Sequence, residues 1–158
     1  MCGVPYHSAD AYIARLIAKG YKVAICEQME DPALAKGLVD RDVIRVISPG
    51  AVIDASMLEE GRNNYLCAIY EDSDGAGLSF CDLSTGEFTA TAFTGADRTA
   101  HLLNDLGAYR PREALLSDGA FSNAELTAFL KNRLECRCEN GGEGRFRGEV
   151  AADTRSEE

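Results

Sequence analysis

Three short strand-like runs separated by tight turns most constrain the fold of this chain. The runs cover residues 64–71, 78–83 and 87–93, and Asp74-Gly75 and Ser84-Thr85-Gly86 supply the turns between them. Turns this short join neighbouring antiparallel strands. We therefore expect an antiparallel meander. In its third strand, Phe88, Ala90 and Ala92 alternate with Thr89, Thr91 and Phe93. We expect the first set to form a packed face and the second set a mixed face.

Helical and strand-like patterns alternate after the meander. We expect a helix over 97–106 ended by Gly107, a strand over 113–116, a helix capped by Ser122 with Glu125 in the capping-box position, and a strand over 133–138. Short crossovers after a meander imply a mixed sheet with flanking helices. The predicted class is therefore α/β, and this order of elements is the one found in ribonuclease-H-like folds.

The first 50 residues have a smaller α+β pattern. A helix is expected over 8–19, with Ser8 as its N-cap and Gly20 at its end, followed by strands over 22–28 and 42–48. One helix and two strands would be marginally stable alone. We therefore expect an incomplete α+β domain, the tail of a larger one whose earlier strands are missing.

These patterns divide the chain into four parts. Residues 1–50 form the incomplete domain, 51–63 a linker, and 64–138 a compact mixed-sheet domain. Residues 139–158 are Gly-rich and charged without a period, so they are expected to be a flexible tail or truncated linker.

Charge and hydropathy narrow the function classes. The net charge is −10 and no segment is basic, so none predicts a self-sufficient phosphate-binding surface. No apolar run approaches the roughly 18 residues that span a bilayer. The N-terminus also lacks the pattern of a signal peptide. We expect neither export nor membrane insertion.

Six cysteines raise the question of disulfides or metal. Without an export signal, such cysteines usually behave as small buried hydrophobes. Cys136 and Cys138 would place both sulfurs on one strand face, but a zinc site needs about four ligands. Neither His7 nor His101 lies at a ligand spacing from that pair. A cysteine-based redox or metal protein is therefore the weakest alternative.

Specific motifs follow one another over residues 1–93. They are MCGVPYH at 1–7, VAICEQ at 23–28, DP at 31–32, KG at 36–37, Arg41, Val43, RVISPG at 45–50, NNYL at 63–66 and DLSTGEF at 82–88. In this order they resemble the MutS family of DNA mismatch repair proteins, covering the later half of the mismatch-binding domain and the start of the connector domain. Residues 94–138 agree in pattern only.

The resemblance implies that this chain is a non-catalytic part of a larger protein. Bacterial members are homodimeric clamps in the cytoplasm, associated with the nucleoid, that find mispaired bases in duplex DNA, switch state with ATP and recruit MutL. The family's base-probing Phe-x-Glu element and its G-x-x-x-x-G-K-[ST] phosphate loop do not occur in this chain. ATP and magnesium are thus expected to bind elsewhere in an intact protein, with no catalytic residue, cofactor or metal ligand here.

Five residues are candidate DNA contacts. Met1 resembles a family position near the probed base step. Tyr6 and His7, beside a helix N-terminus, can donate to a phosphate, or they simply pack as a turn. Arg41 and Arg45 are expected to share one strand face and to reach a phosphate, or to form a solvated edge.

Two further functions are weighed against this one. A ribonuclease-H-like metal-dependent nuclease needs a carboxylate in its first strand, and residues 65–70 contain none, which leaves Asp82 and Asp118. An independent protein-interaction module is the other alternative. Acidic turns at Glu71-Asp72, Asp74 and Asp118 suit a protein-binding periphery that could face MutL, although such charges often serve only solubility.

Overall fold

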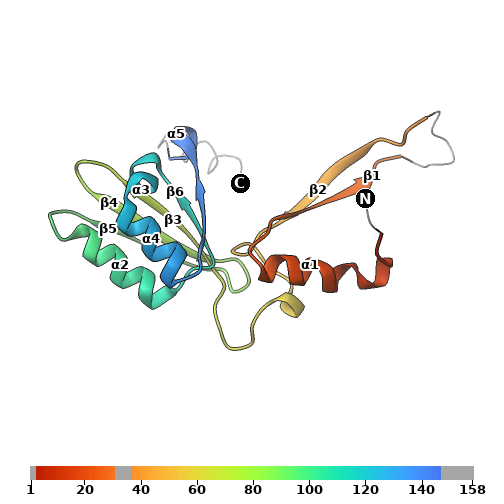
Figure 1. The fold of residues 1–158 in the computed structure, drawn as a ribbon, viewed down its shortest axis with the longest axis horizontal. Coiled ribbons are helices and arrows are strands. Elements are labelled where there is room, and N and C mark those ends of the chain that lie inside the picture. Colours follow the sequence, from red (N-terminus) through yellow and green to blue (C-terminus); the bar gives the residue numbers. More distant parts are fainter. Residues whose placement is uncertain (1–2, 31–36, 147–158) are drawn as a thin grey trace. The chain divides into compact units, whose positions relative to one another are not determined.

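A computed structural model describes residues 3–30 and 37–146 of the chain. The chain divides into two compact units, Met1–Pro49 and Gly50–Glu158, which are described separately (Figure 1). Within the described ranges, no helix combines the length and the apolar character needed to cross a bilayer.

The first unit contains one helix and one strand pair. Its elements are the 3-10 helix η1 (Tyr6–Ser8), α1 (Ala9–Ala18), β1 (Val23–Gln28) and β2 (Arg41–Ile47), with β1 and β2 antiparallel. Ser8 is the N-cap residue of α1, as expected, but its side chain makes no capping hydrogen bond, because η1 precedes α1 without a break. The Ser8 N–H instead donates to the Pro5 carbonyl at 2.9 Å.

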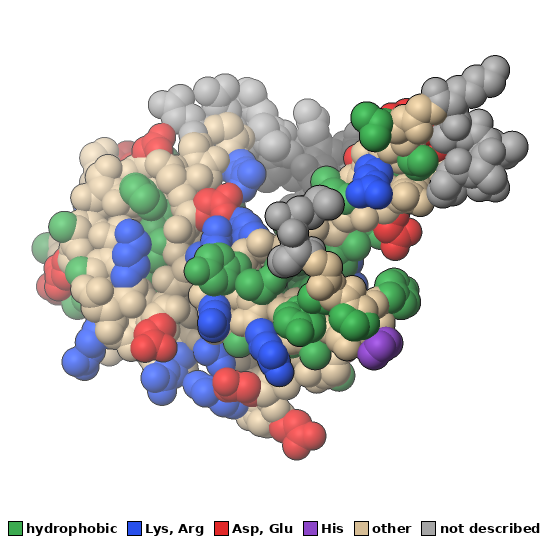
Figure 2. Space-filling view, turned by 45° about the vertical axis from the view of Figure 1, so that its right-hand side comes forward, with side chains coloured by type: hydrophobic (Ala, Val, Ile, Leu, Met, Phe, Trp, Pro, Cys, Tyr) green, Lys and Arg blue, Asp and Glu red, His purple; other side chains and the backbone are tan. Residues whose placement is uncertain are grey.

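Much of the apolar surface in this unit is open. Ile17 of α1 is buried, with 6% of its surface exposed. Hydrophobic side chains on both the helix and the hairpin are nevertheless exposed, among them Leu16, Val43, Ile44 and Val46. Figure 2 shows hydrophobic side chains of this unit at the surface, interspersed with charges of both signs.

The second unit is built on a five-stranded mixed sheet. Its strands are β3 (Tyr65–Glu71), β4 (Ala76–Asp82), β5 (Glu87–Phe93), β6 (Glu113–Leu116) and β7 (Arg137–Asn140), in the order β5-β4-β3-β6-β7. The β3-β4-β5 meander is antiparallel, whereas β6 is parallel to both β3 and β7. The predicted meander and mixed sheet are confirmed.

Helices supply the other half of the hydrophobic core. The helical elements of this unit are η2 (Ala55–Met57), α2 (Arg98–Tyr109), α3 (Asp118–Ser122), α4 (Ala124–Ala128), the π-helical turn η3 (Phe129–Arg133) and α5 (Gly142–Arg145), and the core residues come from α2, α3, α4 and η3. Leu102 and Leu106 of α2 and Leu126 of α4 are fully buried against the inner faces of β3, β4 and β6. Figure 1 shows α2 and α4 beside one another along the sheet.

Helix α2 continues past its predicted end. Gly107 lies inside the helix, which ends at Tyr109 and is followed by Arg110 in the left-handed conformation with φ 52°. The Arg110 N–H closes the last turn on the Leu106 carbonyl at 2.8 Å, and Pro111 follows. At Gly107 an added Cβ would lie 3.7 Å from Phe129, so this glycine faces a neighbouring aromatic ring rather than a helix end.

The expected cap at Ser122 is also wrong. Ser117 caps α3 by accepting from the Ala120 N–H, and Asn123 caps α4 by accepting from the Leu126 N–H. The Ser122 hydroxyl donates instead to the Asp118 carbonyl at 2.8 Å. Two short helices, each with its own cap residue, therefore stand where the sequence predicts a single helix that begins after Ser122.

Two strand predictions need correction. The last strand is β7, Arg137–Asn140, rather than 133–138, because η3 extends to Arg133. Ordered structure also continues beyond Glu139 into α5, whereas residues 147–158 of the expected tail lie outside the described part. On β5 the faces are exchanged: Phe93 packs on the core, and Phe88 is 66% exposed.

Candidate functional site

The turn before α1 presents its aromatic side chain to solvent. Tyr6 is 97% exposed, so its ring does not pack at the start of the helix, and His7 is exposed beside it. Both belong to η1, which runs directly into α1. The geometry leaves both side chains accessible to a ligand. Met1 lies outside the described residues.

Arg41 and Arg45 do not share a face of the hairpin. Arg41 is opposite Gln28, but Arg45 is opposite Ile25, because the register shifts between Ile25 and Cys26. Paired residues project to the same side of a sheet, and sides alternate along a strand. One extra residue in β2 therefore turns the two guanidinium groups to opposite sides. The expectation of a shared face is wrong for this reason.

The two carboxylates considered for a nuclease lie at opposite ends of the sheet. Asp82 pairs with Tyr65 at the start of β3, whereas Asp118 follows β6 beside Glu71 at its end. Six residues of strand separate these ends, or about 20 Å at the usual rise per residue. Asp82 and Asp118 therefore cannot share one metal ion. Across residues 3–30 and 37–146, no cluster of three or more His, Cys, Asp or Glu is arranged around a metal position.

Asp82 instead organises the turn between β4 and β5. Its carboxylate accepts from the Ser84 hydroxyl at 2.6 Å, the Ser84 N–H at 2.9 Å and the Asn64 N–H at 3.0 Å. Burial alone would raise the pKa of Asp82, but these hydrogen bonds to the charged form outweigh burial and lower it. The DLSTGEF motif thus begins with a structural acid.

The acidic turns noted in the sequence come together at the other end of β3. Glu71 accepts from the Asn123 amide at 2.9 Å and lies 3.6 Å from the Arg98 guanidinium. Asp72 accepts from the N–H groups of Asp74 and Gly75 at 2.8 and 3.0 Å. Parallel pairing of β3 and β6 brings Asp118 to the same end, so the topology gathers residues that are far apart in sequence.

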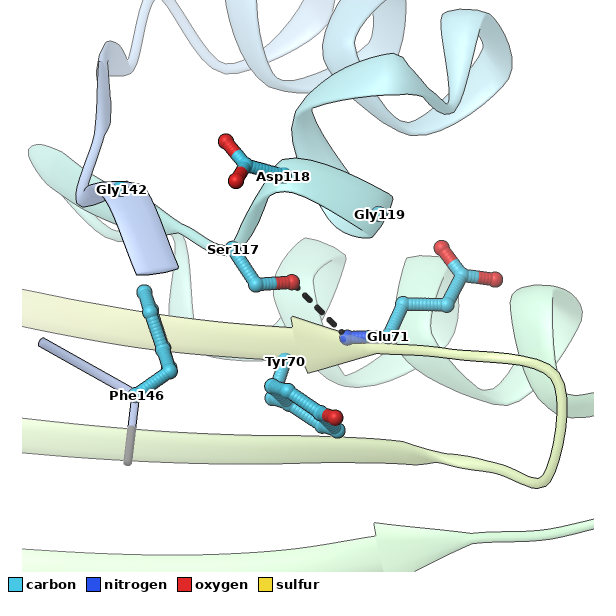
Figure 3. A pocket seen from close by; sticks show the side chains of 7 residues that line it. All are labelled: Tyr70, Glu71, Ser117, Asp118, Gly119, Gly142 and Phe146. Atoms are coloured by element: carbon cyan, nitrogen blue, oxygen red, sulfur yellow. Dashed lines mark hydrogen bonds between the residues drawn. The ribbon is translucent and has the colours of Figure 1, made fainter. Parts of the chain in front are cut away.

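A shallow cavity of about 340 Å³ opens at this end of the sheet. Its lining residues are Tyr70, Glu71, Ser117, Asp118, Gly119, Gly142 and Phe146. Figure 3 shows the side chains of Tyr70 and Glu71 pointing to opposite sides of β3, with the Ser117 hydroxyl 3.1 Å from the Glu71 N–H. Asp118 accepts from the Asn140 amide at 2.9 Å. Aromatic and acidic groups therefore border one opening.

Sequence reasoning missed the residues that hold this end together. Arg98 pairs with Glu71 and donates to the carbonyls of Asp72 and Ser73 at 3.3 and 3.4 Å. Asn123 joins Glu71 to the start of α4. An arginine at the start of a helix gave no such signal, because its partners lie about 25 residues earlier.

The two units therefore define a modular α/β protein with a small α+β part and a complete mixed-sheet part. The family model described as MutS domain I matches residues 1–56, and the one described as MutS domain II matches residues 64–153. The chain belongs to the MutS family of DNA mismatch repair proteins, as the sequence motifs predicted.

Curated relatives agree with this assignment. Proteins named DNA mismatch repair protein MutS from Ruminiclostridium cellulolyticum and Symbiobacterium thermophilum are 51% and 53% identical over 134 and 131 residues. The one from Methanosarcina acetivorans is 46% identical over 142 residues. These matches cover 85%, 83% and 83% of this chain. The chain spans only 15–16% of the length of these relatives.

Proposed function

We propose that this chain is the non-catalytic joint of a mismatch recognition protein. It supplies the later part of the mismatch-binding domain and the connector domain, which links mismatch reading to the ATPase and clamp parts and offers a surface to MutL. The observation that carries this proposal is the match of two successive MutS domains, in order, to one chain. In the intact protein the partners are mismatched duplex DNA, a second copy of the protein and MutL.

The second unit is proposed to be ribonuclease-H-like in fold but not in activity. Its strand order, with three antiparallel strands followed by two parallel ones, supports the fold. The separation of Asp82 from Asp118 by the length of β3 supports the absence of nuclease chemistry. The domains that we propose are 1–50, a linker over 51–63, and a second domain that begins at 64 and continues past residue 138 through β7 and α5.

The hairpin geometry gives a sharp test of DNA contact. One duplex lying against one side of the hairpin reaches either Arg41 or Arg45, but not both. In the intact protein, we expect only one of Arg41→Ala and Arg45→Ala to weaken binding to matched and mismatched duplexes alike. For that variant, the slope of the logarithm of the binding constant against the logarithm of the salt concentration is expected to fall in magnitude by about one.

Fluorescence anisotropy over a salt series measures both quantities. Arg15→Ala is the matched control, because Arg15 lies over the Tyr12 ring on α1, 5.7 Å from its centroid. Equal losses for Arg41→Ala and Arg45→Ala would contradict the separation of the two arginines, and no loss for either would remove the hairpin from the DNA surface.

The acidic end of β3 is proposed to face MutL. Tyr70 and Asp118 line the opening there, and Asp72 and Asp74 follow in the turn after β3, where Asp72 accepts from the Tyr70 hydroxyl at 3.0 Å. An exposed charge at the rim of an interface acts mainly through attraction to its partner. We expect Asp74→Lys in the intact protein to weaken capture of MutL by about threefold to tenfold, measured by surface plasmon resonance with ATP and mismatched DNA present.

A charge change elsewhere controls for this effect. Glu60→Lys makes the same change at an exposed position before β3, at the opposite end of the sheet. Equal weakening by Glu60→Lys and Asp74→Lys would indicate a general charge effect. Unchanged capture by Asp74→Lys would exclude this end of the sheet as the docking surface.

A further inference from the structure

Three thiols gather around the last strand of the second unit. Cys67 of β3 and Cys138 of β7 both pair with Ala114 of β6, one on each side, so the three residues form one row across the sheet. Cys136 precedes β7, and its thiol donates to the Arg137 carbonyl at 3.8 Å. All three are free thiols. Cys67 and Cys136 belong to the hydrophobic core and Cys138 packs against it, but the proposed function gives the three thiols no role.

Only one pair in the cluster has the spacing of a disulfide. Cys67 and Cys138 are two strand spacings apart, or about 10 Å, which exceeds the roughly 7 Å between Cα atoms that a disulfide tolerates. Cys136 and Cys138 are separated by one residue, which keeps their Cα atoms within about 7 Å even in extended chain. The Cys138 sulfur also lies 3.6 Å from the Cys136 carbonyl.

The position of β7 allows the small movement that a bond requires. In the described sheet β7 is an edge strand, paired only with β6. Its outer side carries no ladder of hydrogen bonds within the described residues. Glu135, immediately before the pair, has φ 53°, so the chain turns sharply into Cys136. The Cys136 N–H donates to the Leu130 carbonyl at 2.9 Å, so η3 holds the start of the pair and β6 holds one side of the strand that follows.

The two thiols differ in access and in acidity. Cys138 is partly exposed, whereas Cys136 is buried with 4% of its surface exposed. The interaction with the Cys136 thiol, together with the charge of Lys131, lowers the pKa of Cys138 although burial opposes this. The same interaction and burial raise the pKa of Cys136. Because the thiolate is the nucleophile, Cys138 is the attacking thiol and Cys136 the resolving one.

We propose that Cys136 and Cys138 form a reversible thiol–disulfide site that reacts with a low-molecular-weight disulfide. The Cys138 thiolate attacks one sulfur of the small disulfide, forms a mixed disulfide and releases one small thiolate, which takes up the proton lost by Cys138. Cys136 then gives up its proton and attacks the Cys138 sulfur, and the second small thiol leaves with that proton. Two protein thiols are oxidised and one small disulfide is reduced to two thiols.

Incubation of the intact chain with glutathione disulfide tests the site. Cys2, Cys26 and Cys81 are first replaced by serine, so that only the cluster can react. After the remaining thiols are alkylated, mass spectrometry is expected to show loss of two hydrogen atoms in the peptide that contains residues 136–138, with Cys67 alkylated. Reduction with dithiothreitol restores both thiols. The proposal does not depend on DNA or MutL binding.

Single substitutions separate the two roles. Cys136→Ser is expected to stop at a stable glutathione adduct on Cys138, whereas Cys138→Ser abolishes reaction at this site. Cys67→Ala is the matched control and leaves the disulfide unchanged. A glutathione adduct that persists on Cys138 while Cys136 is intact would overturn the proposal. So would a disulfide that includes Cys67, or no reaction at the pair in the folded protein.

Discussion

Phe80→Ala is expected to lower the free energy of unfolding of the second unit by about 3–5 kcal/mol. Phe80 is 3% exposed, and its ring stacks on Tyr109 with the centroids 4.1 Å apart. It also meets Tyr65 edge to face at 5.9 Å. Removing the ring loses buried apolar area and leaves a cavity beneath α2 that these two tyrosines cannot fill without moving. Urea unfolding followed by circular dichroism measures the loss.

Phe88 provides a matched control one strand away. It lies on β5 opposite Cys81, the neighbour of Phe80, but its side chain is 66% exposed. Phe88→Ala is therefore expected to cost less than about 1 kcal/mol, since surface substitutions away from special features change stability little. Similar losses for the two variants would contradict the assignment of the inner and outer faces of the meander.

The strands were largely predictable because their signals are local and repeated. Tight turns at Asp74-Gly75 and Ser84-Thr85-Gly86 leave few ways to pair β3, β4 and β5, and an alternating pattern shows that each strand is half buried. The pattern does not say which half is buried. On β5 the threonines and Phe93 face the core instead of Phe88, because the alternating inner positions of β4 fix the face of its neighbour.

Helix ends were less predictable because several neighbouring residues are each suited to be the N-cap residue. Ser117, Ser122 and Asn123 can each cap a helix, and the sequence alone does not rank them. Tertiary contacts decide the outcome. Ser117 also receives the Glu71 N–H at 3.1 Å, so the position of β3 selects Ser117 as a cap. Gly107 was interpreted as a helix end by the same local logic, although a packing contact explains its small size.

For the candidate DNA contacts, the sequence names residues but does not determine how they are arranged. The family motifs selected Tyr6, His7, Arg41 and Arg45, but one extra residue in β2 decides which side each arginine faces. A bulge of this kind changes no sequence period that could be noticed beforehand. Conversely, the sequence predicts the acidic turns as a protein-binding or merely solvated periphery, without showing that they lie close together. The parallel pairing of β3 with β6 makes them neighbours.

Gly119→Ala is expected to destabilise the second unit by more than about 3 kcal/mol. A Cβ at this position would lie 2.0 Å from the Glu71 carbonyl oxygen and 3.0 Å from its carbon. Both are backbone atoms at the end of β3, so no side-chain rotation relieves the clash. Hydrogen bonds from the Ser117 N–H to the Ile69 carbonyl, at 2.9 Å, and from the Glu71 N–H to Ser117 hold α3 against the strand. Relief therefore requires α3 and β3 to separate.

Gly107→Ala adds the same methyl group, but here the free energy of unfolding is expected to rise. Its added Cβ would lie 3.7 Å from Phe129, an ordinary contact, within a regular turn of α2. Alanine is favoured over glycine inside a helix by roughly 0.5–1 kcal/mol, so Gly107→Ala should stabilise the unit by about that amount. Urea titrations of both variants measure the change in the free energy of unfolding of the whole unit. Hydrogen exchange at the Ser117 and Glu71 amides shows whether α3 separates locally from β3. Because the methyl group has no free space at Gly119, a Gly119→Ala protein as stable as the parent would show that α3 does not pack on the end of β3.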